Sequence, residues 1–135
     1  MGDPNRPKHT MSRIFLLLLL PLAALAAEPP PDIAVGDWVF RAGTGRESAI
    51  IREIDHGEYS HIGIVTAVEP IVRITHATTD DDPAHPNQII ESDYAAYTAP
   101  AIADKTAVAR PAFLSADERR AIAAQAAARL GEPFR

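Results

Sequence analysis

Two runs of β-branched and aliphatic residues stand close together near the middle of the chain. They cover residues 61–68 and 71–77, and only Glu69-Pro70 separates them. Because proline has no N–H to give to a strand ladder, its place between the two runs predicts a hairpin with the proline in the turn. Shorter runs typical of strands cover residues 37–40, 88–91 and 106–110. The pattern therefore predicts several short strands rather than one long helical bundle.

Helical spacing appears on either side of these strands. Ile50, Ile51 and Ile54 recur at helical intervals between residues 47 and 55, and Gly57 is expected to end that helix. A single helical turn is predicted over residues 92–97.

The C-terminal region carries the clearest helix signal. Residues 115–118, Ser-Ala-Asp-Glu, form a capping box, in which serine and glutamate each satisfy a free backbone N–H. Ile122, Ala126 and Leu130 follow as an apolar stripe, and Gly131 marks the expected end of the helix. The order strand, helix, several strands, helix predicts an α+β fold with a small antiparallel sheet or barrel packed against helices.

The first 27 residues differ from the rest and are typical of a leader. Basic residues precede the apolar stretch 14–20, and Ala24-Leu25-Ala26 forms a small-residue cleavage site. This arrangement predicts a secretory signal peptide, with Met11 as the probable start. The apolar stretch is too short and too interrupted for a stable membrane span, so we expect an exported protein, periplasmic or secreted.

A proline-rich linker over residues 28–31 leads into one domain at 32–135. The chain carries 13 Lys and Arg against 18 Asp and Glu, a formal net charge of −5. This acidic balance argues against a nucleic-acid partner. The 135 residues contain no cysteine, so packing rather than disulfides must stabilise the domain.

Two histidines are predicted to meet on the hairpin. If Val68 pairs with Ile71 across the turn, His76 lies opposite Gly63. His61 and His76 then point to the same face as diagonal neighbours, about 7–8 Å apart and within side-chain reach. Gly63, which has no side chain, would leave the space between the two rings open. A loop one residue longer would place the rings on opposite faces.

Three interpretations of these histidines remain open at this point. They could be two ordinary histidines of a half-buried sheet, or half of a catalytic site. The third is a metal site, but no two histidines show the i,i+4 spacing of a helical metal motif. Its candidate ligands would be His56, His61, His76, His85 and the acidic residues 80–82.

Four short motifs, which follow one another along the chain in the same order as in a known family, indicate a resemblance to that family. They are Gly-Asp-Trp-Val-Phe at 36–40, Tyr-Ser-His-Ile-Gly-Ile-Val at 59–65, Thr-His-Ala at 75–77, and Arg-Leu-Gly-Glu-Pro-Phe at 129–134. Together they resemble the circularly permuted NlpC family of papain-like cysteine hydrolases, in its YiiX/YebB-like branch. The resemblance spans the domain from residue 32 to the last residue and implies a permuted papain-like fold.

The resemblance also implies roles. His61 matches the catalytic base, and His76 matches the polar residue that orients it, a position that is often glutamate in this branch. Independently of the resemblance, Tyr59 could line the substrate cleft or be a packing residue ahead of the strand. The family's nucleophile is a cysteine at the start of a helix that follows the last motif, so we expect the thiol beyond Arg135 and the chain as given to be an inactive fragment. No cofactor and no metal is implied.

The substrate class and two other functions stay open. The hydrolase would act on a small peptide, amide or lipid-linked substrate, with cell-wall peptides among the candidates. A related acyltransferase of the lecithin retinol acyltransferase type would pass the acyl group to an acceptor instead of water. A secreted binding module without chemistry is the remaining alternative. A serine could serve as the nucleophile in place of the thiol, but none of the candidates is convincing. They are Ser60, Ser92 and Ser115.

Overall fold

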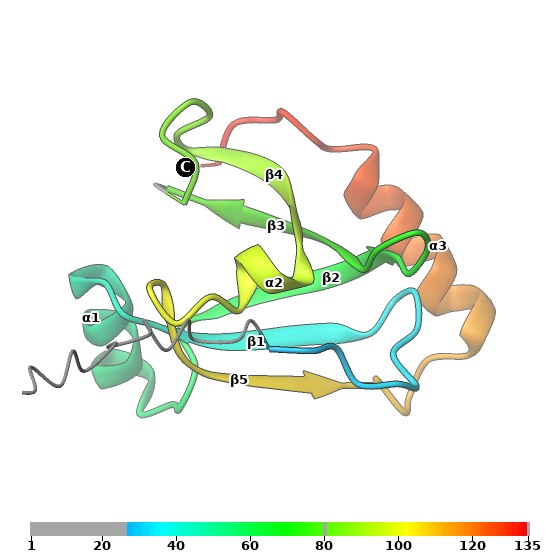
Figure 1. Ribbon diagram of the computed structural model, residues 1–135, viewed down its shortest axis with the longest axis horizontal. Helices are drawn as coiled ribbons and strands as arrows, with labels where there is room; N and C mark the ends of the chain where they lie inside the picture. Colours follow the sequence, from blue (N-terminus) through cyan, green and yellow to red (C-terminus); the bar gives the residue numbers. More distant parts are fainter. Residues whose placement is uncertain (1–26, 80, 135) are drawn as a thin grey trace, which may run out of the picture.

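The computed structural model describes residues 27–79 and 81–134, and within them it is an α+β protein built on one antiparallel sheet. The strands are β1 (Trp38–Gly43), β2 (His61–Ala67), β3 (Arg73–Thr78), β4 (Gln88–Asp93) and β5 (Ala103–Ala109). Their order across the sheet is β4-β3-β2-β1-β5, as Figure 1 shows from top to bottom. The α+β class and the antiparallel sheet are thereby confirmed.

Three helices accompany the sheet. They are α1 (Arg46–Asp55), α2 (Tyr94–Tyr97) and α3 (Ala116–Ala127). In Figure 1, α1 and α3 lie at opposite ends of the sheet, and the short α2 crosses in front of it. Helix α3 packs against β2 and β3, whereas no residue of α1 is buried.

The core lies between the sheet and α2. It is formed by Val39, Val65, Val72, Ile74, Tyr94 and Tyr97, all of them buried. Because side chains alternate along a strand, the residues on the other face meet α3 instead. There a hollow of about 310 Å³ lies between the sheet and α3, lined mainly by apolar side chains such as Ile62, Ile122 and Ala126.

The register of the central hairpin agrees with the prediction at the histidine end. Ile64 pairs with Thr75 and Val65 pairs with Ile74, which continues to place His76 opposite Gly63. Nearer the turn the ladder shifts by one residue, so β3 begins at Arg73 rather than at residue 71. The connection is therefore longer than a two-residue turn, and it contains a cis peptide bond before Pro70.

Other boundaries differ from the sequence prediction in small ways. β1 continues through Gly43, beyond the predicted run 37–40, because β5 pairs with it along its whole length. Helix α1 ends at Asp55, and His56 caps it with a left-handed φ of 52°, one residue before Gly57. The capping box of α3 is present, with Ser115 and Glu118 bonded reciprocally. Leu130 of the predicted stripe is 44% exposed because the helix has already ended.

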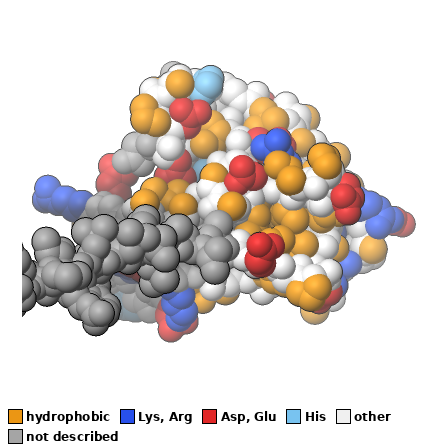
Figure 2. Space-filling model, in the orientation of Figure 1, with side chains coloured by type: hydrophobic (Ala, Val, Ile, Leu, Met, Phe, Trp, Pro, Cys, Tyr) orange, Lys and Arg blue, Asp and Glu red, His pale blue; other side chains and the backbone are white. Residues whose placement is uncertain are grey.

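The leader, with its signal peptide and cleavage site, falls almost wholly in residues 1–26, outside the described residues. Among the residues that are described, no helix has the length and apolar character needed to cross a membrane. Figure 2 shows acidic and basic side chains scattered among apolar ones over one face of the molecule.

Gly63 is the tightest point of the sheet next to the histidines. A Cβ there would lie 2.3 Å from Cγ2 of Ile74 and 3.3 Å from the ring of Tyr97. The space at this glycine is thus filled by core side chains, and the expectation that it stays open is wrong.

Replacing Gly63 by alanine should therefore destabilise the domain. We expect a loss of about 1–3 kcal/mol in the free energy of unfolding, because Ile74 and Tyr97 must shift to admit the methyl group. Urea denaturation followed by tryptophan fluorescence measures the change. Gly57→Ala is the matched control, since a Cβ there meets only ordinary contacts of 3.7 Å or more. Equal stability of the two variants would contradict this account of Gly63.

Candidate functional site

The two hairpin histidines are in direct contact. Nε2 of His61 lies 2.9 Å from Nδ1 of His76, a hydrogen-bond distance. The rings meet edge to face, with centroids 5.1 Å apart. His61 begins β2 beside Arg41 of β1, and His76 lies in the middle of β3, so the sheet fixes both side chains. The predicted meeting of these histidines is confirmed.

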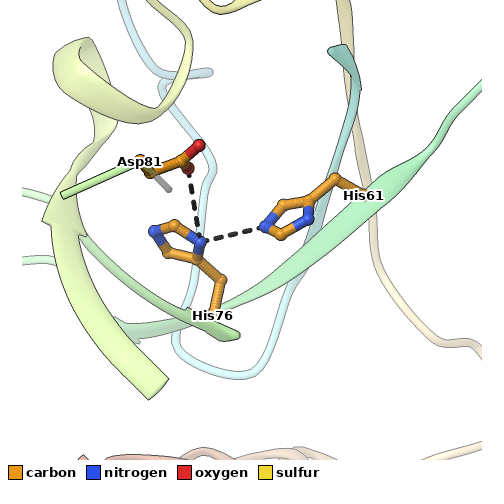
Figure 3. Close-up of side chains that lie close together, drawn as sticks. All are labelled: His61, His76 and Asp81. Carbon is orange, nitrogen blue, oxygen red and sulfur yellow. Dashed lines mark hydrogen bonds and ion pairs between the residues drawn. The ribbon is translucent and has the colours of Figure 1, made fainter. Parts of the chain in front are cut away.

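His76 has two further polar neighbours, whereas His61 has none among the described residues. Nε2 of His76 lies 3.0 Å from Oγ of Ser92 on β4, and Nδ1 of His76 lies 3.8 Å from Oδ2 of Asp81. Figure 3 shows His76 between His61 and Asp81. Nδ1 of His61 has no hydrogen-bond partner in the described part of the chain and is not among its buried unpaired atoms. His61 therefore has one nitrogen held by His76 and one free.

An arginine balances the carboxylate of this cluster. Arg41 is 4% exposed and forms an ion pair with Asp81 through its Nη2 atom. Its guanidinium also lies over the ring of Tyr97, with 4.7 Å between Cζ and the ring centroid. Nε of Arg41 is buried and has no hydrogen-bond partner among residues 27–79 and 81–134. The pair Arg41–Asp81 thus brings one positive and one negative charge beside two imidazoles.

The ring of Tyr97, from α2, packs against both histidines and Arg41. Its ring centroid lies 5.9 Å from that of His61 and 4.9 Å from that of His76. Its hydroxyl donates to the carbonyl of Val39 at 2.8 Å, and burial raises its pKa above the ordinary value. Tyr97 therefore acts here as a neutral packing residue that excludes water from beneath the imidazoles.

Both imidazoles are held neutral. Burial is the main cause, and it lowers the pKa of His61 to about 4 and that of His76 to about 3. The positive charge of Arg41 lowers both values further, while Asp81 acts in the opposite direction. At neutral pH each ring therefore carries one proton and one lone pair, and can act as a donor and as an acceptor.

Two hollows open beside His61. One, of about 470 Å³, is lined by polar groups from the β1–α1 connection and the loop after β3, among them Arg41, Thr44, Glu47 and Asp81. The other, of about 360 Å³, is lined mainly by apolar residues, among them Phe40, Ile51, Ile62 and Phe134. His61 lines both hollows, so its side chain lies between a compartment with many polar groups and a mainly apolar one.

Tyr59, predicted to line the substrate cleft, lines the apolar hollow with His61. Its ring packs on Phe40, with centroids 5.7 Å apart, and Nζ of Lys105 lies 5.2 Å from its centroid. These contacts also suit a packing residue, so the role of Tyr59 in binding stays a prediction.

The serines lie in different surroundings. Oγ of Ser60 accepts from the backbone N–H of Gly43 at 3.0 Å, and Ser115 caps α3. Ser92 contacts His76, but it does not line either hollow beside His61. None of the three therefore combines a free hydroxyl, a histidine partner and open space.

His61, His76 and Asp81 are also the one group of three potential metal ligands within residues 27–79 and 81–134. Their ligand atoms all lie within 4.8 Å of one another. Arg41, however, already pairs with Asp81, and the two imidazoles share a hydrogen bond. The contacts are those of a hydrogen-bonded network whose cation is an arginine. The other histidines of the metal interpretation lie apart, His56 at the end of α1 and His85 on Asp82.

Sequence reasoning missed Arg41 and Tyr97, and it considered Ser92 only as a nucleophile. A signal for Arg41 existed, because alternation along β1 places it on the same face as buried Val39. Tyr97 had none beyond its helical turn. Comparison of the chain with protein-family models, curated proteins and solved structures gave no significant match. The functional argument therefore rests on the residues and their geometry.

The low pKa values of the two histidines make stability depend on pH. In the unfolded chain a histidine titrates near 6.5, so between that pH and about 4 the unfolded state binds more protons than the folded one. The free energy of unfolding should therefore fall as the pH drops through this window, by up to about 1.4 kcal/mol per pH unit for each histidine.

Carboxylates also titrate in this pH range, so the contribution of His61 is measured by comparing the unaltered chain with a variant that lacks this histidine. We expect His61→Gln to show a shallower loss of stability between pH 6.5 and 4 than the unaltered chain, measured by urea denaturation at each pH. His56→Asn changes an exposed histidine at the C-cap of α1, where asparagine also tolerates the positive φ, and should keep the original slope. Parallel curves for all three proteins would contradict the buried neutral state of His61.

Proposed function

We propose that this domain provides the base of an exported cysteine hydrolase of the circularly permuted NlpC type, which cleaves an amide or ester bond. The observation that carries the proposal is the contact between His61 and His76 at 2.9 Å, which leaves Nδ1 of His61 free beside two hollows. An imidazole oriented through one nitrogen and free at the other is the arrangement that a general base requires.

In the proposed reaction, Nδ1 of His61 takes the proton of a thiol. The thiolate attacks the substrate carbonyl, and His61 returns the proton to the departing amine or alcohol as a thioester forms. Water then hydrolyses the thioester. During these steps the transient imidazolium of His61 keeps its bond to His76, and the carboxylate of Asp81 favours its positive charge.

The 135 residues contain no cysteine, so in this proposal the thiol comes from a segment outside them. The apolar side chains around His61 support such an arrangement. Ile51, Ile62 and Phe134 border the apolar hollow and are 41–45% exposed. A further segment packed there would bury them and bring a side chain to the free nitrogen of His61.

The test starts from the complete open reading frame. We expect it to encode a cysteine beyond residue 135, and its product to hydrolyse p-nitrophenyl acetate or a p-nitroanilide in a reaction that iodoacetamide blocks. His61→Gln should lower the rate by about 10²–10⁴-fold, because the base is lost. His85→Gln, which changes an exposed histidine, is the matched control and should keep the rate.

The 135-residue chain should be inactive toward the same probes. A reading frame without a further cysteine would sink the proposal. So would hydrolysis that survives both alkylation and the loss of His61.

The apolar hollow also favours one alternative, transfer of an acyl group to an acceptor as in enzymes similar to lecithin retinol acyltransferase. Phe40, Ile51 and Ile62 would suit the hydrocarbon part of an acyl donor. Analysis of the products with and without an acceptor amine separates transfer from hydrolysis. In either case the leader supports export, because its basic start, apolar stretch and small-residue site are those of a signal peptide.

A further inference from the structure

We propose that Ser92 is a positioning residue, which fixes the proton arrangement of His76 and through it leaves Nδ1 of His61 as the basic nitrogen. The basic role of His61 rests on the function proposed above, whereas the proton arrangement itself is a property of the 135-residue chain. Two consecutive contacts carry it, and they run from β2 through β3 to β4.

The contacts form one line across the sheet. Nε2 of His61 faces Nδ1 of His76 at 2.9 Å, and Nε2 of His76 faces Oγ of Ser92 at 3.0 Å. Each neutral imidazole has one N–H and one lone pair. The two protons therefore have only two arrangements in which both contacts are hydrogen bonds, and these arrangements differ at the free nitrogen of His61.

In the first arrangement, both rings carry their proton on Nε2. His61 donates to His76, His76 donates to Ser92, and Nδ1 of His61 keeps a lone pair. In the second, Ser92 donates to His76, His76 donates from Nδ1 to His61, and the proton of His61 stands on Nδ1. Only the first gives a base that faces the hollows.

Two considerations favour the first arrangement, and one opposes it. A neutral imidazole in water prefers its proton on Nε2, and the first arrangement meets that preference in both rings. Ser92 has no other hydrogen-bond partner in the described residues, so its oxygen is free to accept. The remaining pull comes from Asp81, whose negative charge attracts a proton toward Nδ1 of His76.

Arg41 weakens that pull. Asp81 lies 3.8 Å from Nδ1 of His76, beyond hydrogen-bond distance, while Arg41 pairs with it directly. Tyr97, the other titratable group packed against both rings, stays neutral and uses its hydroxyl on Val39. The Arg41–Asp81 pair therefore pulls only weakly on the proton of His76, and the acceptor on β4 decides the arrangement.

Loss of the Ser92 hydroxyl should reverse the arrangement. In Ser92→Ala the first arrangement would leave the N–H of a buried ring without an acceptor, and an unpaired buried donor is the less tolerated defect. We expect the protons to move to the second arrangement, with Nδ1 of His61 protonated in most molecules. Ser92→Thr keeps a hydroxyl at the same position and should retain the original arrangement.

The experiment is ¹⁵N NMR of the imidazole nitrogens of the 135-residue chain at neutral pH. Protonated and unprotonated ring nitrogens have well separated shifts, and His61→Gln and His76→Gln assign the signals. We expect protonated Nε2 and unprotonated Nδ1 for His61 in the unaltered chain and in Ser92→Thr, and the reverse in Ser92→Ala. Dispersed amide spectra show that each variant is folded.

Two results would overturn the inference. One is a proton on Nδ1 of His61 in the unaltered chain, a result that needs no variant. The other is a folded Ser92→Ala whose His61 keeps the original arrangement. Because this measurement uses neither a thiol nor a substrate, its outcome is independent of whether the hydrolase proposal holds. If both hold, Ser92→Ala in the active protein should lose rate as His61→Gln does, and Ser92→Thr should restore it.

Discussion

The arrangement of the site depends on the burial of two polar side chains, His76 and Arg41, which must find hydrogen-bond or ion-pair partners inside the sheet. His76 is 3% exposed and Arg41 is 4% exposed, and both lie on the same face as the apolar core. A buried polar group costs free energy unless it is hydrogen-bonded or paired. Each of these side chains therefore constrains the next: Arg41 holds Asp81, and His76 takes up both His61 and Ser92. Moving one member would leave another without a partner.

The register of β2 and β3 could be predicted because its physical cause is local. The alternation of the hairpin strands and the proline between them limit the pairing to a few choices, and the observed pairs Ile64–Thr75 and Val65–Ile74 follow from the simplest one. The capping box of α3 was predictable for the same reason, since four adjacent residues satisfy one another. The extra length of the turn was not, because a bulge depends on how the backbone bends to join strands already paired.

The rest of the site comes from elements that the sequence does not place beside the hairpin. Asp81 lies in the loop after β3, Tyr97 belongs to α2, and Ser92 comes from β4. Their approach to His61 depends on the order of strands in the sheet and on the way α2 folds back over it, which are tertiary features without a local signature. The contact between the two imidazoles could thus be predicted from the sequence. The tertiary fold determines which other side chain contacts each ring nitrogen.

The last described residues add a constraint of a different kind. Residues 131–134 run beside the start of β4, with backbone hydrogen bonds from Gly131 to Ile89, from Ile89 to Glu132 and from Phe134 to Asn87. Phe134 thereby reaches the wall of both hollows next to His61, which lies 73 positions earlier in the chain. Opening of this sheet edge alone would remove Phe134 from the wall of both hollows, while the bond between His61 and His76 would remain, because that bond joins β2 to β3. The shape of the compartment around His61 therefore depends on the pairing of residues 131–134 with the start of β4.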